Sequence, residues 1–304
     1  MFIKSSYAEF MNKLISKPGL KFYPKKYLGQ NFLINPGILN KIVQAAEVGS
    51  EDIIVEIGPG TGNLTEKLSE KAGRVIAIEK DRRLIDELRE KFKNTNVEII
   101  EGDVLKLDIG KLFVNCKLKI ENFDYKVVGN IPYYITSRLI RTIFEKRSSE
   151  GAKPRSIPEE LVRGWSRPKL IVLTVQKEVA QRITAKPPHM NLLALSVQFY
   201  SDITIIGYVS KGSFRPTPKV DSAIVSLRPK AEGLKPAEKE LFFKLIKAGF
   251  SGKRKQLISN LSRNFDMIRE DLLKIFSKLD IKQDARAENL SIEQWKELEN
   301  YIKG

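Results

Sequence analysis

The N-terminal half of the chain alternates between short apolar runs and stretches with helical spacing. The run Ile53–Ile57 is short and β-branched, which is typical of a buried parallel strand. Glycines follow at positions 58, 60 and 62, and then Leu64, Leu68 and Ala72 recur every four residues, as on one face of a helix. The pattern predicts a strand, a glycine turn and a helix, the first unit of a nucleotide-binding α/β fold.

Three further apolar runs each end in a polar residue that suits ligand binding. Residues 74–79 end in Glu79, about 20 residues after Gly60, which is the spacing at which an acidic side chain meets ribose hydroxyls. Residues 97–103 end in Asp103, and residues 125–130 end in Asn130. Because parallel strands bring their carboxyl ends to one edge of a sheet, we expect these side chains to converge on the glycine turn.

The glycine turn favours S-adenosylmethionine over a nicotinamide dinucleotide as the cofactor. The dinucleotide fingerprint G-x-G-x-x-G seats a pyrophosphate on a helix N-terminus. Here the glycines run G-x-G-x-G and follow Glu56. A carboxylate would repel a pyrophosphate but suits a cationic amino-acid moiety, so methyl transfer is the leading chemistry. We expect Gly58 and Gly60 at the methionine end, Glu79 on the ribose and Asp103 on the adenine ring.

The run Asn130-Ile-Pro-Tyr133 indicates the methyl acceptor. The exocyclic amine of adenine is a poor nucleophile because its lone pair is delocalised into the ring. The Asn130 side-chain oxygen and the next backbone carbonyl can accept hydrogen bonds from this amine and so localise the lone pair. Pro132 would fix the turn and Tyr133 would stack on the base. The alternative is an ordinary Asn-x-Pro turn followed by core tyrosines.

With these residues assembled, the chain resembles the adenine-N6,N6-dimethyltransferases of ribosomal RNA, in particular the small-subunit branch. The resemblance covers about residues 25–295. It is carried by Lys25–Leu33, Val55–Gly60, Glu79, Gly102-Asp103, Asn130–Tyr133, Gln176–Ala180, Phe214–Ser222 and Gly249–Lys255.

The resemblance implies a function and a set of binding residues. The implied reaction is the transfer of two methyl groups to each of two adjacent adenines near the 3′ end of small-subunit rRNA. The implied cofactor is S-adenosylmethionine, and the small ribosomal subunit is the implied partner. The residues implied to line the cofactor site are Gln30, Asn31, Leu33, Gly58, Glu79, Asp103 and Asn130.

The remaining pattern predicts a Rossmann-like methyltransferase sheet of the α/β class with a small C-terminal all-helical domain. Residues 170–176 read as the fifth strand, and residues 203–209 and 222–227 as an antiparallel pair that closes the sheet. By resemblance the loop from Phe214 helps to hold the flipped adenine. Phe214 would either stack on that base or pack into the core, and the sequence leaves both open.

The predicted domain boundaries follow from breaks in periodicity. Residues 1–24 read as a basic N-terminal extension, residues 25–230 as the catalytic domain and residues 231–304 as the helical domain. Residues 147–168 read as an insertion into the catalytic domain, either an extra RNA-contacting loop or a variable surface loop. Ser291–Gln294 predicts a capping box at the start of the last helix.

The charge of the chain points to a polyanionic partner. There are 53 Lys and Arg residues against 37 Asp and Glu residues, a net charge of +16. Residues 244–263 contain no acidic residue, so we expect an RNA-contacting patch here rather than a merely solvated face. The basic residues of this stretch are Lys244, Lys247, Lys253, Arg254, Lys255 and Arg263.

Several classes of protein are disfavoured. No apolar run reaches the ~18–20 residues of a membrane span, and the N-terminus has no apolar signal region. Cys116 and His189 are the only residues of their types, which leaves no internal disulfide and no plausible metal cluster. We expect a cytoplasmic monomer. The rival functions are a large-subunit rRNA adenine methyltransferase of the resistance type and a ribosome-assembly factor for which binding matters more than catalysis.

Overall fold

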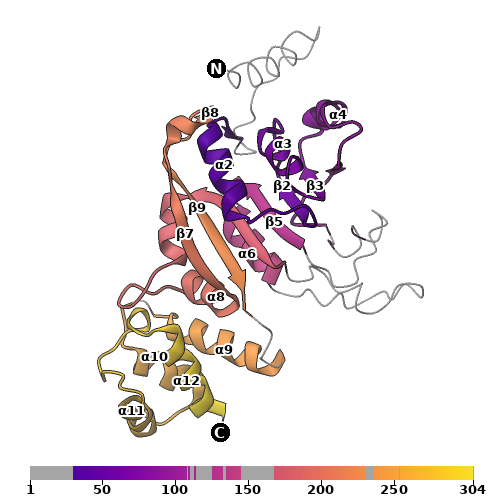
Figure 1. The fold of residues 1–304 in the computed structure, drawn as a ribbon. Helices are drawn as coiled ribbons and strands as arrows, with labels where there is room; N and C mark the ends of the chain where they lie inside the picture. The colour runs from indigo at the N-terminus through magenta and orange to yellow at the C-terminus, as the bar shows by residue number, and fades with distance from the viewer. Residues whose placement is uncertain are drawn as a thin grey trace, which may run out of the picture. The chain divides into compact units, whose positions relative to one another are not determined.

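The computed structural model describes residues 30–107, 109, 113, 125–132, 135–144, 168–230, 236–252 and 254–303 (Figure 1). Two compact units are present. The first takes the chain up to Ala180 together with Thr204–Pro229, and the second takes Gln181–Ile203 together with Lys230–Gly304. The predicted extension at 1–24 and all of the 147–168 insertion except Pro168 lie outside the described residues.

The first unit is built on a seven-stranded sheet in the order β4-β3-β2-β5-β6-β9-β7. The five strands from β4 to β6 are parallel, and β9 is antiparallel to β6. The strands are β2 (Ile53–Ile57), β3 (Arg74–Glu79), β4 (Val97–Glu101), β5 (Tyr125–Asn130), β6 (Leu170–Gln176), β7 (Ser201–Val209) and β9 (Ser222–Pro229). The predicted α/β sheet is confirmed, including the fifth strand at 170–176 and the two closing strands.

The central strands are apolar because both of their faces are covered. Val55 pairs with Ile76 on one side and with Val127 on the other, and all three are fully buried. Strands of a parallel sheet that is covered on both faces read as continuous β-branched runs, which is what made them visible in the sequence.

Helices cover both faces of this sheet. In Figure 1, α2 (Pro36–Ala45), α3 (Asn63–Ser69) and α4 (Arg82–Lys91) lie on one side, and α6 (Thr136–Phe144) lies on the other. Asn35 caps α2, since its Oδ1 accepts hydrogen bonds from the backbone N–H groups of Gly37 and Ile38 at 3.0 and 3.2 Å. The segment before α2 is therefore held at a defined angle to the helix.

A second, two-stranded sheet was not predicted. It joins β1 (Phe32–Leu33) to β8 (Phe214–Arg215) in antiparallel register, with Leu33 opposite Phe214. The backbone N–H of Ile34 also donates to the carbonyl of Ser213 at 2.9 Å, next to a short 3-10 turn, η3 (Lys211–Ser213). This pairing ties residues 30–34, called the arm below, to a loop near the end of the same unit.

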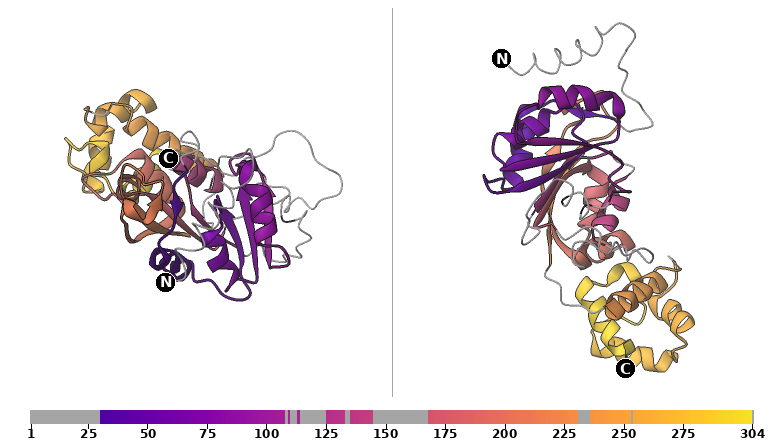
Figure 2. Two further views of the ribbon diagram at one scale, coloured as in Figure 1. Left: turned by 90° about the horizontal axis from the view of Figure 1, so that it is seen from above. Right: turned by 90° about the vertical axis from the view of Figure 1, so that its right-hand side faces the viewer.

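The second unit is helical (Figure 2). It contains the end of α7 (Lys177–Ile183), α8 (Leu192–Tyr200), α9 (Pro236–Gly249), α10 (Leu257–Phe265), α11 (Arg269–Lys278), η4 (Ala287–Asn289) and α12 (Ile292–Lys303). Residues 181–203 group with this second unit, whereas the sequence predicted them to be part of the catalytic domain. The reason is packing, since α8 contacts α9 and α12, and Phe199 stacks on Phe242 with ring centroids 4.3 Å apart. The exact domain boundaries stay a prediction.

Side-chain hydrogen bonds fix two places in the helical unit, the start of α12 and the connection between α9 and α10. The predicted capping box is present, because Ser291 N–H donates to Oε1 of Gln294 at 3.1 Å and Gln294 N–H donates to Oγ of Ser291 at 3.3 Å. Buried Asn260 donates its amide to the carbonyls of Gly249 and Gly252 at 2.7 and 3.2 Å, which fixes the connection between α9 and α10. Within the described residues, no helix has both the length and the apolar character needed to cross a membrane.

Candidate active site

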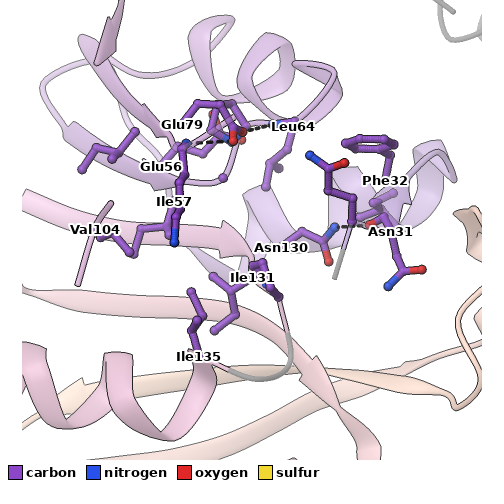
Figure 3. Close-up of a pocket in the computed structure, with 18 of the residues that line it drawn as sticks. Asn31, Phe32, Glu56, Ile57, Leu64, Glu79, Val104, Asn130, Ile131 and Ile135 are labelled. Carbon is purple, nitrogen blue, oxygen red and sulfur yellow. Dashed lines mark hydrogen bonds between the residues drawn. The ribbon is translucent and has the colours of Figure 1, made fainter. Parts of the chain in front are cut away.

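A cavity of about 210 Å³ opens at the carboxyl ends of the parallel strands of the first unit (Figure 3). Nine residues predicted from the sequence as cofactor-binding or catalytic line it together. They are Gln30, Asn31, Leu33, Gly58, Gly60, Glu79, Asp103, Asn130 and Pro132. The convergence expected from the parallel strand ends is therefore present in the structure.

The glycine turn needs its glycines for two different reasons. Gly58, Gly60 and Gly62 all have positive φ, at 70°, 58° and 78°, in the left-handed region that other residues avoid. At Gly60 space is also limiting, because a Cβ there would lie 2.8 Å from Cδ1 of Phe32. At Gly58 a Cβ would meet nothing within 4 Å. The turn thus passes close beneath the arm at one glycine and stays open at the other.

Glu79 ends β3 with its carboxylate held against the glycine turn. Its Oε2 accepts from Gly60 N–H at 3.1 Å, and its Oε1 accepts from the N–H groups of Lys80 and Asp81 at 2.8 Å each. Burial raises the pKa of this carboxyl above its usual range, although the three backbone donors oppose that rise. Oε2 accepts one of these three hydrogen bonds and can accept a second, so a fixed acceptor for a ligand hydroxyl is available.

Asp103 stands at the end of the next strand in a different environment. Its Oδ2 lies 3.0 Å from Nζ of Lys80, and its Oδ1 accepts from Leu105 N–H at 3.1 Å. Although burial disfavours the charge, these donors hold the pKa of Asp103 below its usual value. This carboxylate is ionised at neutral pH, and the residue lines the cavity.

Glu56 lies on β2, the strand next to that of Glu79, and accepts none of the hydrogen bonds that hold Glu79. Its side chain is 1% exposed, it lines the cavity, and neither carboxylate oxygen has a hydrogen-bond partner within the described part of the chain. Burial raises its pKa to about 8 and the neighbouring Glu79 carboxylate adds to the rise, while the nearby Thr65 hydroxyl and the Lys91 ammonium oppose it. A buried acceptor pair without donors fits a bound cationic group such as the ammonium of S-adenosylmethionine.

The arm is held at the cavity by side chains at the starts of two helices, α3 and α4. Gln30 donates to Oδ2 of Asp81, the N-cap residue of α4, at 2.7 Å. Asn63 at the start of α3 donates to the carbonyl of Leu33 at 3.0 Å. Although burial works against its charge, Asp81 has a lowered pKa because Arg83 and Gln30 hydrogen-bond to it. The arm therefore forms one wall of the cavity.

Asn130 is oriented by the same arm. Its Nδ2 donates to the backbone carbonyl of Asn31 at 2.9 Å, and Figure 3 shows the amide nitrogen directed at that segment. With the amide group fixed in this way, Oδ1 is the atom left to accept a hydrogen bond from a ligand. Pro132 supports the turn that follows, since its carbonyl accepts from Ile135 N–H at 3.1 Å.

Among the described residues of the first unit, Phe214 was predicted to contact the substrate but does not line the cavity. Phe214 is 0% exposed and packs in the hydrophobic core with Leu33, so the stacking role is wrong for this conformation and core packing explains the ring. Tyr133 and Lys253 lie outside the described residues. Arg254 and Lys255 are exposed in the α9–α10 connection of the second unit, and their RNA contact stays a prediction.

The sequence reading missed the apolar side of the cavity. Ile57, Val104, Ile131 and Ile135 line it and gather on one side in Figure 3, while Phe32 lies on another. Val104 follows Asp103 directly at the end of a strand, which is a position that could have been used to find it. Within the described residues, no group of three or more His, Cys, Asp or Glu side chains is arranged to hold a metal ion.

The fold and the cavity together define a Rossmann-like methyltransferase that uses S-adenosylmethionine. The profile of the family Ribosomal RNA adenine dimethylase matches residues 21–304, and the chain belongs to this family. The resemblance stated from the sequence motifs is thereby confirmed, together with the enzyme class and the cofactor.

Curated relatives match the chain over nearly its whole length. Ribosomal RNA small subunit methyltransferase A of Dehalococcoides mccartyi is 39% identical over 282 residues, which are 92% of this chain and 89% of the relative. The protein of the same description from Bacillus mycoides is 38% identical over 297 residues, which are 95% of this chain and 94% of the relative.

Two solved structures share the fold. A dimethyladenosine transferase from Plasmodium falciparum has a TM-score of 0.67 and 30% identity, and covers 90% of this chain and 98% of its own. The 23S rRNA methyltransferase ErmE has a TM-score of 0.70 and 25% identity, and covers 90% of this chain and 100% of its own.

Proposed function

We propose that this protein dimethylates the N6 amines of two adjacent adenines near the 3′ end of small-subunit rRNA, with the small ribosomal subunit as its partner. The single observation that carries the chemistry is the Asn130 amide at the cavity wall, fixed by the Asn31 carbonyl 2.9 Å away. The choice of the small subunit is supported by the curated relatives of that description at 38–39% identity.

The cofactor side of the reaction is assigned from the lining residues. S-adenosylmethionine supplies an electrophilic methyl group when bound. Glu79 presents a fixed acceptor for ribose hydroxyls, and Asp103 presents an ionised acceptor for the amine of the adenine ring. Glu56 and the turn at Gly58 and Gly60 hold the charged amino-acid end. The apolar side at Ile57 and Val104 excludes water from the adenine ring.

The acceptor side depends on hydrogen-bond acceptors rather than on a base. Oδ1 of Asn130 accepts from the target amine, which localises the nitrogen lone pair and aligns it with the methyl group. Each transfer makes the amine cationic, and it releases one proton to solvent without a catalytic base. The target adenine has to leave its stack to enter the cavity, so an unpaired or locally opened stretch of rRNA is the substrate.

The two rival functions receive less support. ErmE, a 23S rRNA methyltransferase, is similar at 25% identity, whereas the small-subunit relatives are similar at 38–39%. A pure assembly factor would not need Glu79, Asp103 and Asn130 at one cavity. We also infer a monomer that acts in the cytoplasm, in keeping with a soluble rRNA substrate.

The first test supplies labelled S-adenosylmethionine with small subunits, large subunits and free rRNA, all lacking native methylation. The nucleosides are then separated after digestion. N6,N6-dimethyladenosine from the small subunit alone, up to two per particle, is the expected result. Label in the large-subunit RNA would move the protein to the resistance type. Tight subunit binding without label would favour the assembly factor.

Asn130→Ala tests the catalytic assignment. We expect methyl transfer to fall by at least ~100-fold, since a preorganised hydrogen-bond acceptor in the transition state is lost, while rRNA binding is kept. Asn96→Ala is the matched control, because the Asn96 amide likewise donates to backbone carbonyls, those of Ser69 and Ala72, but does not line the cavity. Wild-type methylation by the Asn130 variant would overturn the assignment.

A further inference from the structure

An exposed aromatic ring stands at the edge of the first unit. Tyr208, near the end of β7, is 54% exposed, while the next residue, Val209, is fully buried. Nζ of Lys177 lies 5.2 Å from the centroid of the Tyr208 ring, in cation–π geometry. Both residues belong to the first unit, the one that contains the cavity.

The position of this pair relates it to the catalytic amide. Lys177 directly follows β6, the strand next to β5, and the register pairs Thr174 of β6 with Asn130 of β5. Asp221 holds the surrounding loops together, because its carbonyl accepts from Lys177 N–H and its Oδ1 accepts from Lys211 N–H, each at 3.0 Å. Lys177 thus lies at the same edge of the sheet as Asn130, one strand further along, and its ammonium group reaches Tyr208 on β7, which is three strands from β5 in the sheet order.

The charge around the ring suits a phosphodiester chain. Lys177, Lys211 and Lys219 are exposed and come from three segments that meet here, and the acids among them are Asp221 and Glu178. Val220 next to Lys219 adds an exposed apolar side chain, 44% exposed. An aromatic face with lysines beside it is the arrangement that binds an unpaired nucleotide, since the base stacks and the phosphates pair with the cations.

We propose that Tyr208 and Lys177 form a stacking platform for an unpaired rRNA nucleotide that flanks the target adenine. The inference rests on the proposed function and names a further part of the substrate. It explains how the flanking chain is held after the target base has left its stack: one nucleotide stacks on Tyr208, and Lys177, Lys211 and Lys219 contact the backbone around it.

The direct test places 2-aminopurine at successive unpaired positions of an unmethylated 3′-terminal fragment of small-subunit rRNA. Stacking quenches the fluorescence of this base. We expect wild type to quench it at a position next to the target adenines, Tyr208→Phe to keep the quenching because the ring remains, and Tyr208→Ala to lose it. Equal quenching by Tyr208→Ala and wild type would overturn the proposal.

Affinity and kinetics give a second readout. Tyr208→Ala should weaken binding of the fragment and of unmethylated small subunits by about tenfold, as for loss of one stacked base. Its KM for RNA should rise while kcat and the Kd for S-adenosylmethionine stay at wild-type values, which a general loss of folding would not produce. Weaker binding to the subunit with unchanged binding to the fragment would indicate a protein partner and refute the platform.

Salt dependence tests the lysine. Lys177→Ala should lower the slope of log Kd against log salt concentration by about 1, the contribution of one phosphate contact. Lys93→Ala is the matched control and should leave the slope unchanged, because Lys93 is exposed in the same unit but follows α4 at the amino ends of the strands. If wild type methylates no rRNA at all, the proposed function fails, whereas quenching that depends on Tyr208 still reports on the platform.

Discussion

Two buried glutamates, Glu56 and Glu79, line the cavity, and they differ in the number of hydrogen-bond donors around their carboxylates. Glu79 accepts hydrogen bonds from three backbone N–H groups, whereas Glu56 has no donor within the described residues. The sequence predicted that both lie near the glycine turn, because Glu79 ends an apolar run and Glu56 stands just before Gly58. It did not show that Glu56 is buried beyond reach of water, because burial of a strand end depends on which helix covers it.

Glu56 should make stability depend on pH in the cofactor-free protein. Its pKa is raised to about 8 by burial, so the stability that its neutral form contributes is complete below the unfolded pKa, near 4.5, and is lost as pH rises through 8. Glu56→Gln stays neutral. Between pH 5 and 8 the variant should gain on wild type by on the order of 1 kcal/mol of unfolding free energy per pH unit.

Thermal unfolding of both proteins at pH 5.5, 7 and 8.5 measures this difference. Parallel curves for wild type and Glu56→Gln would show that Glu56 ionises without cost. Cofactor binding gives the complementary readout, because the variant lacks a charge to pair with an ammonium group and should bind S-adenosylmethionine more weakly at pH 8.

At the scale of elements, the strands of the large sheet could be predicted from the sequence, whereas the small sheet of β1 and β8 could not. The five parallel strands are visible in the sequence as short, mostly apolar runs that turn residues separate. The pairing of β1 with β8 involves two residues on each side, far apart in the chain, and has no periodicity to detect. This pairing also decided the position of Phe214: opposite Leu33 in a ladder, its ring enters the core instead of the substrate site.

Two alanine substitutions distinguish the backbone strain of the glycine turn from its close packing against the arm. Both Gly58→Ala and Gly60→Ala put a Cβ at positive φ, which costs roughly 1 kcal/mol each. Gly60→Ala also drives that Cβ to 2.8 Å from the Phe32 ring, whereas Gly58→Ala meets nothing within 4 Å. We expect the Gly60 variant to lose about 1–3 kcal/mol more of unfolding free energy than the Gly58 variant.

Chemical denaturation of the cofactor-free variants provides the comparison, so that no ligand contact enters the result. Equal losses would mean that the Phe32 ring moves aside freely and that the arm is not fastened over the turn. A larger loss for Gly60→Ala, rescued in part by Phe32→Ala in the same chain, would confirm the close packing of arm and turn.

At the scale of the whole molecule, a net charge of +16 sets the response to salt rather than the fold. Exposed cations that touch phosphates should contribute to the salt slope, and those paired within the protein should not. Arg254 and Lys255 are exposed, and the loop that precedes them is held by Asn260.

The double variant Arg254→Ala/Lys255→Ala should bind rRNA more weakly and lower the salt slope by about 2. Lys274→Ala is its control within the same unit, since Nζ of Lys274 pairs with Asp271 at 2.9 Å. Titrations against unmethylated small-subunit rRNA at several salt concentrations provide the slopes. An unchanged slope for the double variant would remove the loop from the RNA-contacting surface.

The hydrogen bond from Asn130 to the Asn31 carbonyl limits what side-chain substitutions can reveal about catalysis. The group that orients the catalytic amide is main chain, so every amino acid at position 31 supplies it. Asn31→Ala would leave this hydrogen bond in place, so any loss that it causes would report on the cofactor site that the side chain lines and not on the orientation of Asn130. Only a shift in the path of the backbone, such as a one-residue deletion in the arm, would reveal that catalysis depends on it.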